Sequence, residues 1–66
     1  MSEAEAAERR YLDVEELAQY IRSTPASVRQ LVHLKRVPYI KRGRRLLFDV
    51  IEVDRWLGAQ RVEVEA

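Results

Sequence analysis

The sequence predicts one small domain, mostly α-helical with a single β-hairpin. Apolar residues recur at helical spacing in three stretches, each preceded by a residue that can cap a helix. Between the second and third stretches the pattern changes to alternation around a glycine, as in a hairpin. A chain of 66 residues leaves room for one core, and with no cysteine and one histidine we expect no disulfide, no metal site and no cofactor.

The first helix is expected from about Val14 to Ile21. Asp13 can cap its amides, Glu16 stands in the capping-box position, and Leu12 can pack on Leu17 as a hydrophobic staple. The stripe that this helix buries consists of Val14, Leu17, Ala18 and Ile21.

The second helix follows after a turn of a few residues, with Thr24 as its cap and Pro25 at its first position. So short a turn between two short amphipathic helices makes them cross at a steep angle. The stripe that faces inward consists of Val28, Leu31 and Val32. The outer face presents Ala26, Ser27, Arg29, Gln30 and His33.

Pro38 ends this helical region, and a hairpin is expected around Arg42-Gly43-Arg44, where Gly43 can adopt a positive φ. We expect the strands to direct inward Ile40, Leu46 and Phe48. Facing outward we expect Lys41, Arg45 and Leu47.

The third helix has Asp49 as its cap, Glu52 as the capping-box partner, and Gly58 as its stop. Phe48 and Val53 form the staple. The inward stripe consists of Val50, Val53, Trp56 and Leu57. The domain therefore spans residues 11–58, between a disordered lead-in (1–10) and a flexible tail (59–66) that orders on a partner. No apolar run is long enough for a membrane span, and we expect a cytoplasmic protein without a small-molecule ligand.

Charge is segregated along the chain although the net charge is only +1. No acidic residue occurs between Glu16 and Asp49. The same stretch carries Arg22, Arg29, His33, Lys35, Arg36, Lys41, Arg42, Arg44 and Arg45. A polyanion is the natural partner of such a block, whereas the simpler interpretation is a solvated basic surface.

The segment from Tyr11 to Leu57 resembles the excisionase family, small DNA-binding domains related to the DNA-reading part of the MerR regulators. The resemblance is carried by Tyr11-Leu12-Asp13-Val14-Glu15-Glu16-Leu17-Ala18, Ser23 to Val32, Val37-Pro38-Tyr39-Ile40-Lys41-Arg42-Gly43-Arg44-Arg45, Phe48 and Trp56-Leu57. Its most specific part is the basic hairpin combined with the terminal Trp-Leu pair. Leu34 and Lys35 depart from it, since relatives often have small turn-forming residues there, and Leu47 replaces a residue that is frequently basic.

The resemblance implies a winged helix-turn-helix whose second helix enters the major groove of double-stranded DNA, while the hairpin reaches phosphates or the minor groove. It also implies several copies bound cooperatively side by side, bending the DNA and directing a site-specific recombinase toward excision. We expect the tail to contact that integrase.

The DNA-contacting residues that we predict fall into three groups. On the recognition helix they are Thr24, Ala26, Ser27, Arg29, Gln30 and His33. On the wing they are Lys41, Arg42, Gly43, Arg44 and Arg45. Weaker backbone contacts are expected from Arg22, Lys35 and Arg36.

Two other functions fit the same residues. One is a stand-alone transcriptional regulator of the same fold. The other is a protein-interaction adaptor with weak affinity for DNA. No catalytic residue is expected, because the caps account for Asp13, Glu16, Asp49 and Glu52, and one histidine on a cationic helix makes no nucleophile–base pair.

Overall fold

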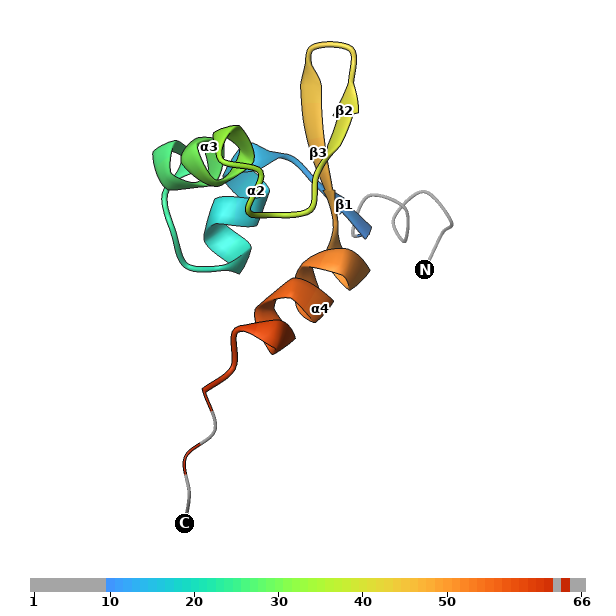
Figure 1. The fold of residues 1–66 in the computed structure, drawn as a ribbon. Helices are drawn as coiled ribbons and strands as arrows, with labels where there is room; N and C mark the ends of the chain where they lie inside the picture. Colours follow the sequence, from blue (N-terminus) through green and yellow to red (C-terminus); the bar gives the residue numbers. More distant parts are fainter. Residues whose placement is uncertain (1–9, 63, 65–66) are drawn as a thin grey trace.

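The computed structural model describes residues 10–62 and residue 64, and in this part of the chain three helices pack with a three-stranded antiparallel sheet (Figure 1). In chain order the elements are β1 (Tyr11–Leu12), α2 (Val14–Tyr20), α3 (Pro25–His33), β2 (Ile40–Arg42), β3 (Arg45–Asp49) and α4 (Val50–Ala59). This is the predicted winged helix-turn-helix, with the β2–β3 hairpin as its wing. The predicted lead-in, except for Arg10, and parts of the tail lie outside the described residues.

The predicted starts of α2 and α3 are confirmed. The Asp13 side chain accepts a hydrogen bond from the Glu16 amide at 2.8 Å, and the Glu16 carboxylate accepts one from the Asp13 amide at 3.1 Å, which completes the capping box. At α3 the Thr24 hydroxyl accepts from the Ser27 amide at 3.1 Å, with Pro25 at the first helical position. Each bond satisfies an amide that the helix itself leaves without an acceptor.

Both α2 and α3 end in a left-handed turn at a basic residue, Arg22 with φ 56° and Lys35 with φ 55°. After Lys35, the Arg36 amide donates to the Leu31 carbonyl at 2.8 Å, and an equivalent bond closes the end of α2. This is the Schellman arrangement, usually built with glycine. Helix α3 thus ends at this turn and not at Pro38.

The start and end of α4 correct the prediction in part. The Asp49 carboxylate caps the helix by accepting from the Ile51 amide at 2.9 Å. The predicted capping box is wrong, because Glu52 makes no hydrogen bond to Asp49 through its side chain among the described residues, and Asp49 is also the last residue of β3. Gly58 is not the stop either, since α4 continues through Ala59.

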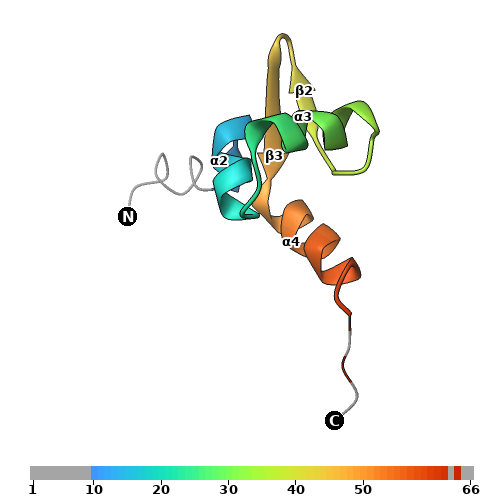
Figure 2. The same cartoon turned by 90° about the vertical axis from the view of Figure 1, so that its left-hand side faces the viewer.

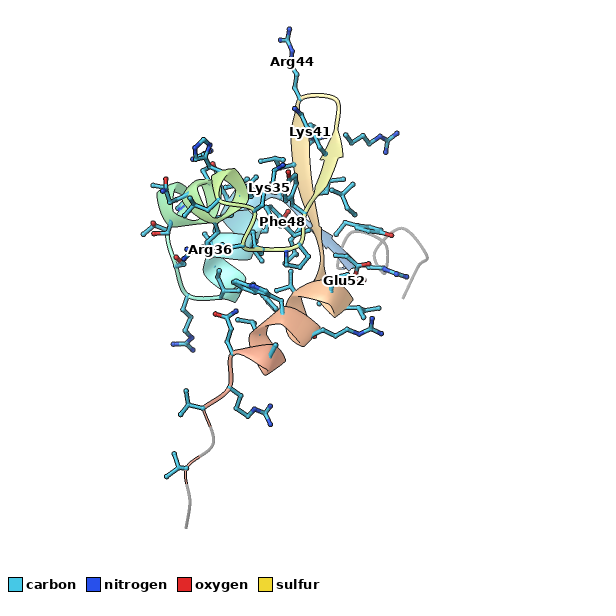
Figure 3. The ribbon with its side chains drawn as sticks, in the orientation of Figure 1. Lys35, Arg36, Lys41, Arg44, Phe48 and Glu52 are labelled. Atoms are coloured by element: carbon cyan, nitrogen blue, oxygen red, sulfur yellow. The ribbon has the colours of Figure 1, made fainter. Side chains whose placement is uncertain are left out.

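The core draws on the helices, the sheet and the link before the wing. Its buried apolar side chains are Leu17, Ala18, Val28, Val37, Phe48 and Val53. Helix α2 packs against α3, and both α2 and α4 pack against β3. Phe48 of β3 lies between α2 and α4 (Figure 3).

The predicted stripes are confirmed for α2 and α3 and in part for α4. Val53 is buried and Trp56 packs against the core. Val50 is half-buried but does not belong to this cluster. Leu57 is 38% exposed, because the last turn of α4 projects beyond the sheet.

Sheet order is β1-β3-β2, so that β3 is the central strand. Tyr11 pairs with Asp49 and Leu12 with Phe48. Strand β1 was not predicted, because two residues carry no detectable alternation.

The wing is closed by a two-residue loop, one residue shorter than predicted. Gly43 leads this loop with φ +61°, the position that glycine occupies in a type II′ turn. The register pairs Ile40 with Leu47, Lys41 with Leu46 and Arg42 with Arg45.

A shift of one residue in register exchanges the two faces of a strand, which overturns the predicted directions of Ile40 and Lys41. Ile40 shares the outer face with Leu47 and is 42% exposed. Lys41 shares the inner face with Leu46, beyond the edge of the core, and remains exposed. The predicted inward directions of Leu46 and Phe48 are confirmed.

Candidate nucleic-acid interface

The proposed DNA-contacting elements are α3 and the wing, and the fold brings them together. Figures 1 and 2 show the wing projecting well beyond the helices, with α3 beside the lower part of the hairpin. The core holds both: Val28 anchors α3, and Phe48 anchors β3. A helix and a projecting ribbon on one rigid body can occupy adjoining grooves of a duplex.

The outer face of α3 is exposed as predicted, and its side chains are Ala26, Ser27, Arg29, Gln30 and His33. The helix has nine residues, so it is about 13 Å long, close to the width of about 12 Å of the major groove of B-DNA. Arg22 precedes α3, and Lys35 and Arg36 follow it at the link to the wing (Figure 3). Exposed cations therefore precede and follow α3 along the chain.

Thr24 and Ser27 play different parts at the amino end of α3. The Thr24 hydroxyl accepts from the Ser27 amide and donates to the Ser27 Oγ at 3.0 Å, so it is used within the protein. The exposed Ser27 hydroxyl keeps its own proton for an outside acceptor. A phosphate at this end would meet that hydroxyl and the positive end of the helix dipole.

The cations of the wing lie at its tip and on both faces of the ribbon. Arg44 stands at the tip and points away from the body of the protein (Figure 3). Lys41 lies on the inner face, whereas Arg42 and Arg45 are paired across the strands on the outer face. A ribbon inserted into a groove has a phosphate strand on each side, so charges on both faces can contribute.

One hollow brings together two predicted contacts from different elements. It has a volume of about 260 Å³ and is lined by Arg29 of α3, Arg45 of β3, and residues at the start of α2 that include Asp13 and Glu15. The sequence placed Arg29 and Arg45 in separate groups of contacts, and the presence of two carboxylates beside them was missed. Their proximity depends on tertiary packing, which no local pattern reveals.

Within the described part of the chain no ion pair joins a cation of the site to an acid, although Asp13 and Glu15 line the same hollow as Arg29 and Arg45. There the one ion pair joins Arg10 to Asp49 at 3.3 Å, away from α3 and the wing tip. Burial alone would raise the pKa of Asp49, but the Ile51 amide and the Arg10 guanidinium outweigh it and hold the pKa below its ordinary value. Arg10 also lies over the Tyr11 ring, 5.5 Å from its centroid.

Helix α4 is held to α2 by a hydrogen bond that the sequence did not suggest. The Tyr20 hydroxyl donates to the Asp54 carboxylate at 2.6 Å, and this bond raises the pKa of Tyr20 above its ordinary value. Over residues 10–62 and 64, none of the helices is long and apolar enough to cross a membrane.

A family model described as a helix-turn-helix domain matches residues 11–61, more than half of the chain and all elements from β1 to α4. No curated protein and no solved structure matches the chain.

Proposed function

Because the chain belongs to the helix-turn-helix domain family of DNA-binding domains, we propose that it binds double-stranded DNA sequence-specifically, with α3 in the major groove. The wing then reaches the flanking phosphates or the adjacent minor groove. The observation that carries this proposal is the exposure of every cation from Arg22 to Arg45 without an acidic partner among the described residues.

Within this complex, base recognition is assigned to the middle of α3. Arg29 can pair with guanine and Gln30 with adenine, and each good bidentate contact discriminates by about 1–3 kcal/mol. Arg44 at the wing tip and Lys41 beside it contribute to affinity for every duplex, because phosphates and groove potential carry little sequence information. The protein acts through binding, and no catalytic step is part of the proposal.

The biological role that we propose is that of an excisionase-like architectural factor. Several copies bind side by side, bend the DNA and direct a site-specific recombinase toward excision. The proposal is supported by the exposed cations of α3 and the wing, which such a factor would place against the duplex. The predicted contact between the tail and an integrase stays a prediction.

Two measurements test this function. Fluorescence anisotropy should show Arg44→Ala with Arg45→Ala weakening binding to all duplexes, and Gln30→Ala reducing the preference for the selected sequence. Equal loss of sequence preference in both variants would contradict the assigned roles. Footprinting on the genomic attachment region should reveal directly repeated sites with hypersensitive positions, whereas one inverted repeat over a promoter would make the protein a transcriptional regulator.

A further inference from the structure

A groove with an apolar floor runs along β2 on the side of the sheet that the helices leave uncovered. At the base of the wing a hollow of about 300 Å³ is lined by Pro38, Tyr39, Ile40, Asp49 and Glu52. Toward the tip a second hollow of about 330 Å³ is lined by Tyr11, Ile40, Arg42 and Leu47. Ile40 lines both, so the two hollows adjoin; we call them together the β2 groove.

The β2 groove combines exposed apolar area with an open strand edge. Tyr39 and Ile40 are 36% and 42% exposed, so two neighbouring large side chains leave apolar area open. Strand β2 pairs with β3 on one side, and no described strand pairs with its other side. Such an edge offers amides and carbonyls to an added strand.

The end of the chain has the sequence of such a strand. After α4 it reads Arg61-Val62-Glu63-Val64-Glu65, which alternates charged and β-branched residues. Val62 and Val64 are 84% and 89% exposed, so the part of the chain that the structure describes leaves both side chains uncovered. We call residues 61–65 the tail strand.

Charge sets the direction and register in which the tail strand matches the groove. Placed parallel to β2 with Val62 beside Ile40, it sets Glu63 beside Lys41 on the inner face. Arg61 then lies beside Tyr39 at the base of the wing, on the same inner face as Glu63 and away from the basic tip. The reverse direction would bring Arg61 toward the basic tip. A shift by one residue would turn both valines to the face of Lys41.

The tail strand cannot reach this position in its own molecule. Helix α4 has ten residues, hence a length of about 15 Å, and in Figures 1 and 2 it leads away from the wing. Arg61 follows two residues after its end, about one helix length from the base of the hairpin. The occupant must therefore come from another molecule.

We propose that the tail strand of one copy adds to the free edge of β2 in a second copy. The contact is heterologous, because the tail of one copy meets the wing of another. In a pair of copies, one copy keeps a free wing and the other a free tail, so assembly can continue as an open chain. This association needs no DNA and is independent of the function proposed above.

Disulfide trapping tests the contact directly, because the natural chain has no cysteine. Neighbouring residues of paired strands come within disulfide range, so Ile40→Cys protein mixed with Val62→Cys protein should form a cross-linked dimer under mild oxidation. The matched control pairs Val62→Cys with Gln19→Cys, an exposed position on α2. All three positions are exposed, so the variants keep the fold, which circular dichroism checks.

A charge exchange tests the register. Lys41→Glu or Glu63→Lys alone, placed in the cysteine variants, should lower the yield about fivefold, because opposite charges across paired strands become like charges. Combining both changes should restore the yield. Equal yields from the Ile40→Cys mixture and the Gln19→Cys mixture, or failure of the combined change to restore cross-linking, would overturn the proposal.

Two other occupants give distinct outcomes that also overturn it. A protein carrying both Ile40→Cys and Val62→Cys that closes an intramolecular disulfide at high dilution would place the tail on its own wing. A tail that cross-links to the recombinase but never to a second copy would make it a recombinase contact. Since no DNA is present in the trapping assay, loss of DNA binding in other experiments leaves its result intact.

Discussion

Lys35 and Arg22 hold left-handed conformations where glycine is the usual choice. A side chain with a β-carbon costs about 1–2 kcal/mol in this region, so these two turns weaken a domain whose total stability is small. In return, each turn carries a cation at one end of the recognition helix. Backbone strain and the proposed DNA contact are thus combined in the same residues.

Lys35→Gly should therefore stabilise the fold and weaken DNA binding. Relief of the left-handed strain outweighs the added entropy of glycine in the unfolded chain by about 0.5–1 kcal/mol. Urea unfolding measures the gain, and anisotropy with a duplex measures the lost affinity. Lys35→Ala, which removes the charge but keeps the β-carbon, should weaken binding without stabilising; a gain of equal size in both variants would contradict the strain.

Substituting alanine at the two glycines should change stability in opposite directions. An added β-carbon would have no atom within 4 Å at either position, so a steric clash affects neither substitution. Gly43 has φ +61°, so Gly43→Ala should destabilise by about 1 kcal/mol or more. Gly58 lies inside α4, where Gly58→Ala should stabilise by about 0.5–1 kcal/mol. Thermal unfolding of both variants should show Tm shifts of opposite sign, and shifts of the same sign would refute the assignment of strain.

The lowered pKa of Asp49 predicts how the stability of the domain changes at low pH. Its pKa is lower in the folded chain than its ordinary value of 3.8, so its contribution to stability is complete above that value and is lost as the pH falls through the folded pKa. Asp49→Asn keeps a capping residue that cannot ionise, and should lose less stability than the wild type between about pH 5 and about pH 2. Arg10→Ala should fall between the two in chemical denaturation, and an identical decline in all three would be inconsistent with the cap and ion pair.

Helices were the most predictable elements because their signals are local. Caps at Asp13, Thr24 and Asp49, together with the apolar spacing, located every helix to within a few residues. The sheet was less predictable, since β1 is too short to show a period and the hairpin register depended on one residue of loop length. Ile40 and Lys41 exchanged faces for that reason, and no residue near Gly43 distinguishes the two loops by composition alone.

Two leucines on different helices differ in burial, and this difference predicts different losses of stability when each is truncated. Leu17 of α2 is fully buried, whereas Leu57 of α4 is 38% exposed, so the same truncation to alanine should have very different costs. Leu17→Ala should destabilise by about 2–5 kcal/mol, which exceeds or approaches the stability of so small a domain. Leu57→Ala should change stability by about 0.5 kcal/mol or less. Urea unfolding gives both values, and a comparable loss at Leu57 would mean that a partner or the tail covers α4.

At the level of the molecule, the sequence predicted a set of cations for the proposed site but not how they are arranged. The cations of the acid-free block from Arg22 to Arg45 are all exposed in the structure, as a basic surface requires. It could not show that Arg29 and Arg45 meet beside Glu15, because this depends on how α2, α3 and β3 pack. Nor could it show that wing cations lie on both faces of the hairpin.

The most direct test of whether these cations meet a nucleic acid is the salt dependence of binding to a short duplex. Anisotropy should give a log–log slope of about −4 to −6, from roughly five or six neutralised phosphates. Arg44→Ala should reduce the magnitude of the slope by about one, whereas Arg55→Ala, an equal loss of charge on α4, should leave it unchanged. A flat response to salt, or equal effects of Arg44→Ala and Arg55→Ala, would contradict a DNA interface formed by α3 and the wing.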